Sequence, residues 1–147
     1  MKRPMKILYL KKTAFRKTIP ALDKSPVIYY HLTTVMELKI RKSEAIYIID
    51  VQGEMDLYNS YKLKELFMKM LEKKIEKIII NLGDVEYIDS SGIGALIYIT
   101  STIKKMNLRL AIVNVHGSVK KVIELTKLSG FFPIHSGLEQ AIHTMDL

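Results

Sequence analysis

Residues 87–94 read Tyr87-Ile88-Asp89-Ser90-Ser91-Gly92-Ile93-Gly94, and they separate two segments with different apolar patterns. Before them, residues 77–82 carry three consecutive isoleucines, a β-branched run that is typical of a buried central strand. After them, apolar residues recur at helical spacing, at Ile93, Leu96, Ile97 and Ile103. The stretch therefore predicts a junction between a strand and a helix, and its polar residues are of the types that begin helices.

Outward from this junction, strand and helix patterns alternate along the chain. The predicted strands are an edge strand over 36–41, a strand covered on both faces over 45–51, and strands over 77–82, 108–113 and 131–134. The predicted helices cover 58–73, the segment after Gly92, 118–128 and a short segment after Ser136. This order predicts an α/β fold in which a single mixed β-sheet of about four to five strands packs against about four helices.

Several polar residues predict where these elements end. Asn81, Gly83 and Asp84 form a predicted turn after the third strand. The helix at 58–73 can be capped by Asp56 or Asn59 and that at 118–128 by Ser118, with Gly130 at the C′ position. The spacing of Ser136 and Glu139 is that of a capping box for the last helix.

The composition excludes several classes of protein. The 147 residues are 48% hydrophobic and 26% charged, which is typical of a globular chain. No cysteine is present, so disulfides and thiolate sites are excluded and a reducing compartment is expected. The apolar run 93–99 is far shorter than the ~20 residues of a membrane span. We therefore expect a cytoplasmic protein without a membrane span.

The net charge of +8 is concentrated at one end of the chain. Residues 1–35 hold eight basic residues and one acidic residue, whereas residues 36–147 hold 15 basic and 14 acidic residues. We therefore expect a poorly ordered or weakly structured basic extension over 1–35 and a nearly neutral domain over 36–147, with Met36 as a candidate start residue. No direct nucleic-acid partner is expected, because the domain carries little excess charge.

Two adjacent hydroxyls, Ser90 and Ser91, stand at the predicted helix N-terminus, where backbone amides lack partners. The simplest role of either serine is that of an N-cap. Two hydroxyls exceed what one cap requires, however, and the small residues Gly92 and Gly94 leave them open to a partner. A phosphate here adds a charge of about −1.5 to −2, which the helix dipole favours by roughly 0.3 to 2 kcal/mol. Such a group changes the surface without unfolding the domain.

Five blocks of the chain resemble the STAS family, and within it the bacterial anti-sigma factor antagonists. They are Gly53-Glu54-Met55-Asp56, Ile79-Ile80-Asn81-Leu82, the stretch 87–94, Ser118-Val119-Lys120-Lys121-Val122 and Leu128-Ser129-Gly130-Phe131-Phe132. The resemblance covers roughly residues 36–145, and the basic extension has no counterpart in it.

The resemblance implies a phosphorylation switch. In this family the serine after the aspartate is phosphorylated by a partner anti-sigma factor, a serine kinase, and a metal-dependent serine phosphatase reverses the reaction. The unphosphorylated antagonist binds the kinase and releases the sigma factor. The implied acceptor is Ser90, with Ser91 as the alternative. Asp56 matches the family's acidic residue beside the kinase interface, and Asp89 matches the aspartate that flanks the acceptor. The expected partner-binding residues are Asp56, Asp89, Ser90, Ser91, Gly92, Ile93 and Gly94.

Other functions have less support in the sequence. A serine nucleophile needs a histidine base, but His31, His116, His135 and His143 form no recognisable arrangement and the motif G-x-S-x-G is absent. Gly92-Ile93-Gly94 lacks the remainder of a nucleotide-binding loop, and no metal-ligand cluster is present. We therefore expect no enzyme activity, catalytic residue, cofactor or metal. The main alternative is a non-switching STAS scaffold, or a subunit of a signalling or lipid-transport complex, in which Ser90 is only a cap.

Overall fold

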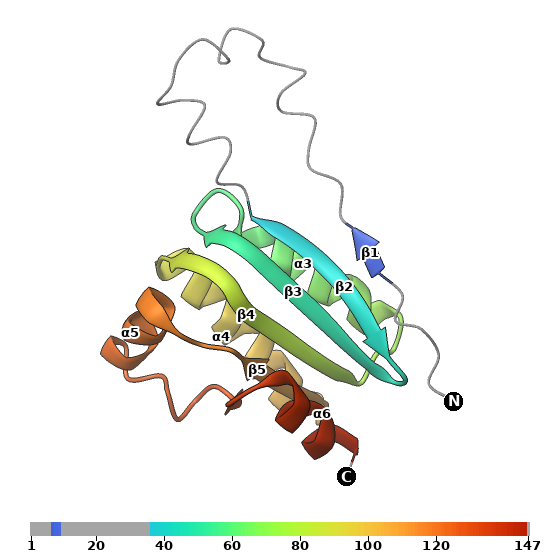
Figure 1. Ribbon diagram of the computed structural model, residues 1–147. Helices are drawn as coiled ribbons and strands as arrows, with labels where there is room; N and C mark the ends of the chain where they lie inside the picture. Colours follow the sequence, from blue (N-terminus) through green and yellow to red (C-terminus); the bar gives the residue numbers. More distant parts are fainter. Residues whose placement is uncertain (1–6, 10–35, 147) are drawn as a thin grey trace, which may run out of the picture.

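The computed structural model describes residues 7–9 and 36–146, which form a single mixed sheet with helices on both faces (Figure 1). The strands lie in sequence order: β1 (Ile7–Tyr9), β2 (Glu37–Ser43), β3 (Ile46–Met55), β4 (Lys77–Ile88), β5 (Arg109–Val113) and β6 (Ile134–His135). The pairs β1–β2 and β2–β3 are antiparallel, and the remaining pairs are parallel. The predicted fold class is confirmed.

The first strand lies within the predicted basic extension. Its three residues pair with Lys39–Arg41 of β2, so β2 is not an edge strand over these residues, contrary to the prediction. The rest of the extension, 1–6 and 10–35, lies outside the described residues. The domain boundary at Met36 therefore stays a prediction.

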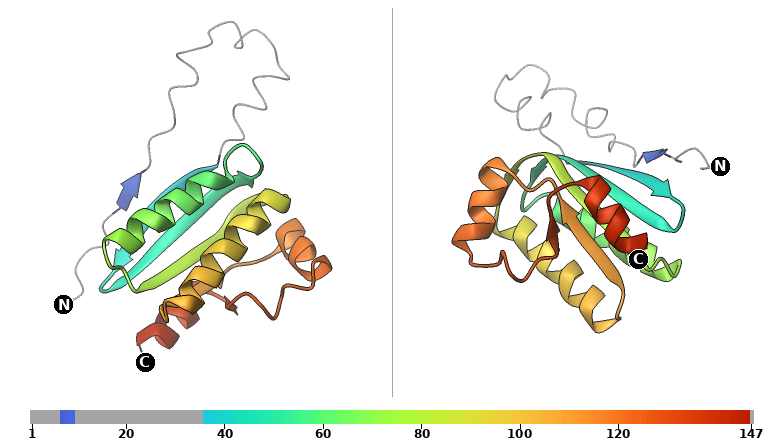
Figure 2. Two further views of the ribbon diagram at one scale, coloured as in Figure 1. Left: turned by 180° about the vertical axis from the view of Figure 1, so that it is seen from behind. Right: turned by 60° about the horizontal axis from the view of Figure 1, so that its bottom comes forward.

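Two helices cover one face of the sheet. Figure 2 shows α3 (Ser60–Glu72) and α4 (Ser90–Lys105) side by side on this face. The apolar stripe of α3 explains its position, because Leu63, Leu66, Phe67 and Met70 are buried. They pack with residues of the sheet and of α4 into the larger core, among them Ile49, Ile80, Leu96 and Ile99.

The opposite face is covered by α6 (Leu138–Asp146). Its buried residues Ala141 and Met145 pack against the other side of the same strands, on Ile46, Ile48, Ile79, Ala111 and Val113. The fourth helix, α5 (Gly117–Leu125), contacts β4, and Ser118 Oγ donates a hydrogen bond of 2.7 Å to the carbonyl of Glu86. Within the described ranges, no helix combines the length and apolar character that a bilayer span requires.

The predicted turn at Asn81, Gly83 and Asp84 is wrong, because β4 continues through it. The Asn81 side chain makes hydrogen bonds along and across the sheet at this point. Its Oδ1 accepts from Gly83 N at 3.0 Å and from Asn114 Nδ2 at 2.9 Å. Its Nδ2 donates to Asp50 Oδ1 at 2.8 Å. The parallel pairing with β3 resumes after register shifts and reaches the end of both strands.

Four predictions near the C-terminus are also wrong. The N-cap of α5 is His116, because Ser118 bonds to Glu86 instead, and the helix is followed by Lys127 at φ 58° rather than ending at Gly130. Ser136 pairs with Gln140 and not with Glu139, through bonds of 2.9 Å from its N and 2.6 Å from its Oγ to the amide oxygen. The predicted strand over 131–134 is reduced to Ile134–His135.

Candidate functional site

The candidate site lies where β3 and β4 end side by side. Met55 and Ile88 are paired at the carboxyl ends of these parallel strands, and Asp89 N donates to the carbonyl of Met55 at 3.0 Å. The chain leaves β3 through a short loop to α3 and leaves β4 directly into α4, near the two adjacent arrowheads in Figure 1. Asp56 and Asp89, which are 33 positions apart in the sequence, thus lie at one edge of the sheet, the edge where open α/β sheets commonly bind ligands.

Asp89 joins the two junctions. Its Oδ1 accepts from the backbone N–H groups of Ser91 at 2.8 Å and Gly92 at 3.2 Å, which makes it the N-cap of α4. Its Oδ2 accepts from Leu57 N at 3.0 Å, so the same carboxylate holds the β3–α3 loop. The interpretation of Ser90 as the cap is therefore wrong. The first-turn amides of Ser91 and Gly92 are also not unpaired, contrary to expectation, because Asp89 uses them.

Ser90 is the first residue of α4 and its side chain is exposed. Among the described residues, nothing forms a hydrogen bond with its hydroxyl. Ser91 is half-buried. Ser90 is thus the more accessible of the two hydroxyls and has no structural role of its own.

The glycines that follow have different surroundings. A Cβ at Gly92 would lie 2.5 Å from Ile88 Cγ1 and 2.9 Å from both Cβ and O of Met55, so only glycine lets α4 begin so close to the strand ends. Gly94 is exposed and has nothing within 4 Å of a Cβ position. Gly92 and Ile93 are buried and lie beneath the surface of the site, whereas Gly94 is exposed and forms part of that surface.

Asp56 organises the loop before α3. Its Oδ1 accepts from Tyr58 N at 2.9 Å, and its own N donates to Asn59 Oδ1 at 2.9 Å. The buried Asn59 also donates to the carbonyl of Glu54 at 2.8 Å and makes no side-chain cap for α3, although it occupies the N-cap position. Asp56 itself is half-buried and follows the end of β3 at the same edge of the sheet at which Ser90 follows β4.

This loop presents two apolar side chains that sequence reasoning missed. Leu57 is 69% exposed and Tyr58 is 76% exposed. The available signal was their position, since both follow Asp56 directly and neither belongs to the buried stripe of α3. Because Leu57 N binds Asp89, the loop that carries them is tied to the start of α4.

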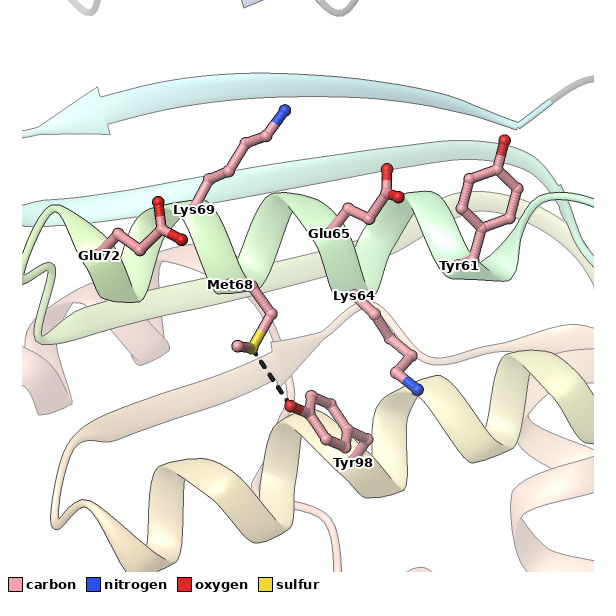
Figure 3. Close-up of a pocket in the computed structure, with 7 residues that line it drawn as sticks. All are labelled: Tyr61, Lys64, Glu65, Met68, Lys69, Glu72 and Tyr98. Carbon is pink, nitrogen blue, oxygen red and sulfur yellow. Dashed lines mark hydrogen bonds between the residues drawn. The ribbon is translucent and has the colours of Figure 1, made fainter.

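A groove of about 540 Å³ lies along α3, beside α4 (Figure 3). Lys64 and Met68 point toward Tyr98 of α4, whose hydroxyl lies 3.2 Å from Met68 Sδ, and Lys64 Nζ lies 4.5 Å from the centroid of the Tyr98 ring. Glu65, Lys69 and Glu72 point away from α4. The lining carries both signs of charge and so favours no charged ligand.

The arrangement of an esterase or a metal site is not found in the part of the chain that the structure describes. His116 Nε2 lies 2.7 Å from the carbonyl oxygen of Gly83, and no histidine of residues 36–146 forms a hydrogen bond with Ser90 or Ser91. His31 lies outside the described residues. No group of three metal-ligating side chains occurs within the described ranges.

Known proteins of similar sequence and of similar structure include anti-sigma factor antagonists. The anti-sigma-B factor antagonist of Staphylococcus aureus is 25% identical over 104 residues, which cover 71% of this chain and 96% of the relative. A candidate anti-sigma factor antagonist from Thermotoga maritima superposes with a TM-score of 0.69 at 26% identity, covering 74% of this chain and 93% of that chain.

The Bacillus anti-sigma factor antagonist SpoIIAA has the same fold. The structure of its unphosphorylated form superposes with a TM-score of 0.62 at 19% identity, and the match covers 74% of this chain and 96% of that chain. The structure of its phosphorylated form superposes with a TM-score of 0.58 at 18% identity, and the match covers 74% of this chain and 98% of that chain. The family model described as the STAS domain matches residues 37–141, which include both strand-to-helix junctions of the site. The chain belongs to the STAS domain family.

Proposed function

We propose that this protein is an anti-sigma factor antagonist whose Ser90 is phosphorylated by a partner anti-sigma serine kinase. Only the unphosphorylated form binds that kinase tightly and thereby releases the sigma factor. The observation that carries the proposal is the division of roles at the start of α4: Asp89 caps the helix, whereas Ser90 is exposed and has no hydrogen-bond partner among the described residues. The names of the S. aureus and Bacillus relatives support the same role, and SpoIIAA is known in a phosphorylated form.

A phosphate on Ser90 leaves the domain folded because the electrostatic effects on it nearly cancel. The positive end of the α4 dipole favours the added charge by roughly 0.3 to 2 kcal/mol. The Asp89 carboxylate opposes it: on the order of 5 Å away in water, it repels a phosphate of charge about −1.5 to −2 by about 1.2 to 1.7 kcal/mol. Because Asp89 already holds the amides of Ser91 and Gly92, the phosphate has little reason to fold back onto the helix. It remains at the surface.

The same phosphate disfavours a docked partner. Leu57 and Tyr58 offer apolar contact area beside Ser90, and a kinase that buries them also covers the start of α4. A phosphate enclosed in that interface loses its hydration next to Asp89 and Asp56, and burying an unpaired charge is unfavourable. Phosphorylation therefore releases the kinase, and a metal-dependent serine phosphatase restores binding.

The alternative is a STAS scaffold or transport subunit that does not switch. In that role Ser90 serves only as a helix cap. Because Asp89 makes the cap, Ser90 is not needed for the fold, and this favours the switch over the scaffold.

The test uses the tagged full chain, purified from its native cell together with the kinase that it retains, and then incubated with ATP and Mg²⁺. We expect one phosphoryl group, placed at Ser90 by peptide mapping, and release of the chain from the kinase. Ser91→Ala is the matched control and should still be phosphorylated, whereas Ser90→Ala should not. Phosphate found only at other residues contradicts the assignment of the acceptor.

A second measurement tests the switch itself. Ser90→Asp should fold normally but bind the kinase at least about tenfold more weakly than Ser90→Ala, because only the former adds charge. Equal affinities of the two variants for the kinase contradict the exclusion of the phosphorylated form.

A further inference from the structure

A second cavity, of about 500 Å³, lies far from Ser90, at the opposite end of α4. Thr100 and Lys104 of α4 line it, which places it about 15 to 20 Å along the helix from the candidate site. The remaining walls come from β5, β6, α6 and the segments beside them: Ile103, Leu108, Arg109, Leu110, Pro133, His135, Thr144 and Met145. The end of α4 and α6 lie on opposite faces of the sheet (Figure 2).

The shortness of β6 explains why a cavity exists here. β6 pairs only with Ile112 and Val113, the last two residues of β5. The first part of β5, from Arg109, therefore has no outer strand among the described residues. The space beside it is closed by the end of α4 on one face of the sheet and by α6 on the other.

The cavity is apolar inside and positively charged at its rim. Ile103, Leu110 and Met145 are buried, whereas Lys104 and Arg109 are exposed. His135 adds a third basic group, and no acidic residue among those that the structure describes lines the cavity. The groove along α3 differs in this respect, because two glutamates and two lysines line it.

The two rim cations are held by neutral groups. Lys104 Nζ donates to the carbonyl of Phe131 at 3.1 Å and lies 4.1 Å from the centroid of its ring. Arg109 Nη1 donates to the carbonyl of Met145 at 3.1 Å. Within residues 36–146, neither cation forms an ion pair with a carboxylate. Both are therefore oriented, and no carboxylate of residues 36–146 neutralises either charge by direct contact.

One wall atom is polar and unsatisfied. Thr100 is 1% exposed, and its Oγ1 has no hydrogen-bond partner among the residues that the structure describes. A buried hydroxyl in this state lowers the stability of a fold.

We propose that this cavity binds a small carboxylate with an apolar body. The body packs against Ile103, Leu110 and Met145, and the carboxylate lies between Lys104 and Arg109 at the rim. The volume lies within the range of small-molecule pockets, and apolar walls with a few placed polar groups are their usual composition. A site at this end of α4 is separate from Ser90, so its occupation does not depend on the proposed phosphorylation.

The experiment titrates sodium octanoate into the ¹⁵N-labelled full chain and follows the backbone amide signals by NMR. We expect saturable shifts at Ile103, Leu110 and Met145 below about 10 mM octanoate. Octanamide, which has the same chain but no charge, should bind at least about tenfold more weakly. Absence of saturation over this range, or equal affinity for octanoate and octanamide, overturns the proposal.

Three variants locate the carboxylate. Lys104→Gln and Arg109→Gln should each weaken octanoate binding about threefold or more, and Lys64→Gln, a matched change in the groove along α3, should leave it unchanged. Lys104→Gln is decisive if Arg109→Gln loosens α6, since Lys104 does not contact that helix through a hydrogen bond. Shifts confined to the groove along α3, with weaker binding only in Lys64→Gln, also overturn the proposal.

Discussion

Replacing Gly92 by alanine tests whether α4 must begin in contact with the strand ends. Gly92 does not require glycine for its backbone conformation, because it is not among the glycines with positive φ. It requires glycine for space: an added Cβ would lie 2.5 Å from Ile88 Cγ1 and 2.9 Å from the Cβ and carbonyl oxygen of Met55. Two of these three atoms belong to or adjoin the backbone of β3 and cannot move independently of it.

The matched control is Gly94→Ala, two residues further along the same helix. Alanine there meets nothing within 4 Å, so the variant should gain the helix propensity of alanine over glycine, about 0.5 to 1 kcal/mol. Gly92→Ala gains a similar amount but also overpacks the junction, which typically costs about 1 to 3 kcal/mol. The difference in unfolding free energy between the two variants, about 1 to 3 kcal/mol, measures the contact alone.

The assay is urea unfolding of both variants and the wild type, followed by far-ultraviolet circular dichroism. Gly94→Ala should unfold at a higher urea concentration than the wild type and Gly92→Ala at a lower one, with similar m-values. If Gly92→Ala is as stable as Gly94→Ala, the close approach of α4 to Met55 and Ile88 is not what requires glycine, and our account of the junction is wrong.

Three further changes test other parts of the site. Asp89→Ala should lower the unfolding free energy by about 2 kcal/mol, because three amide donors lose their acceptor, and Asp89→Asn should lower it by about half as much. Urea unfolding measures both variants. An unchanged stability of Asp89→Ala would show that the Asp89 carboxylate does not hold the two junctions together. Leu57→Ser combined with Tyr58→Ser should change stability by less than about 0.5 kcal/mol yet weaken kinase binding at least about tenfold, as titration calorimetry would show; undiminished affinity excludes this loop from the interface. Asn81→Ala should cost about 1 to 2 kcal/mol and increase amide exchange in the second half of β4, and unchanged exchange would show that the Asn81–Asp50 bond is not what continues the strand.

The elements with strong apolar periodicity could be predicted from the sequence. The stripe of α3 is buried as expected, and the isoleucines of β4 lie between the two cores because a strand covered on both faces needs no alternation. The junction between β4 and α4 was predictable for a similar reason, since the pattern changes there from strand to helix. These signals are local, and local patterns determine which face of an element is buried.

The errors concern choices that distant residues decide. Asparagine and glycine favour a turn, but Asn81 binds Asp50 on one neighbouring strand and Asn114 after the other, so β4 continues. Aspartate and serine are nearly equal as N-caps, and the choice of Asp89 over Ser90 depends on Leu57 N, 32 positions earlier. Rules based on neighbouring residues cannot predict the bonds of Asn81 or that between Asp89 and Leu57, because the partners are far apart in the sequence.

Because Asp89 and Gly92 secure the start of α4, position 90 itself is permissive. Substitution of its side chain removes no hydrogen bond and fills no buried space. Chemistry at this position can therefore diverge between related proteins, or be replaced by a spectroscopic label, without redesign of the scaffold around it. A spin label or fluorophore attached through cysteine at this exposed point, in a chain that has no other thiol, would leave the fold intact and report on the surroundings of the start of α4.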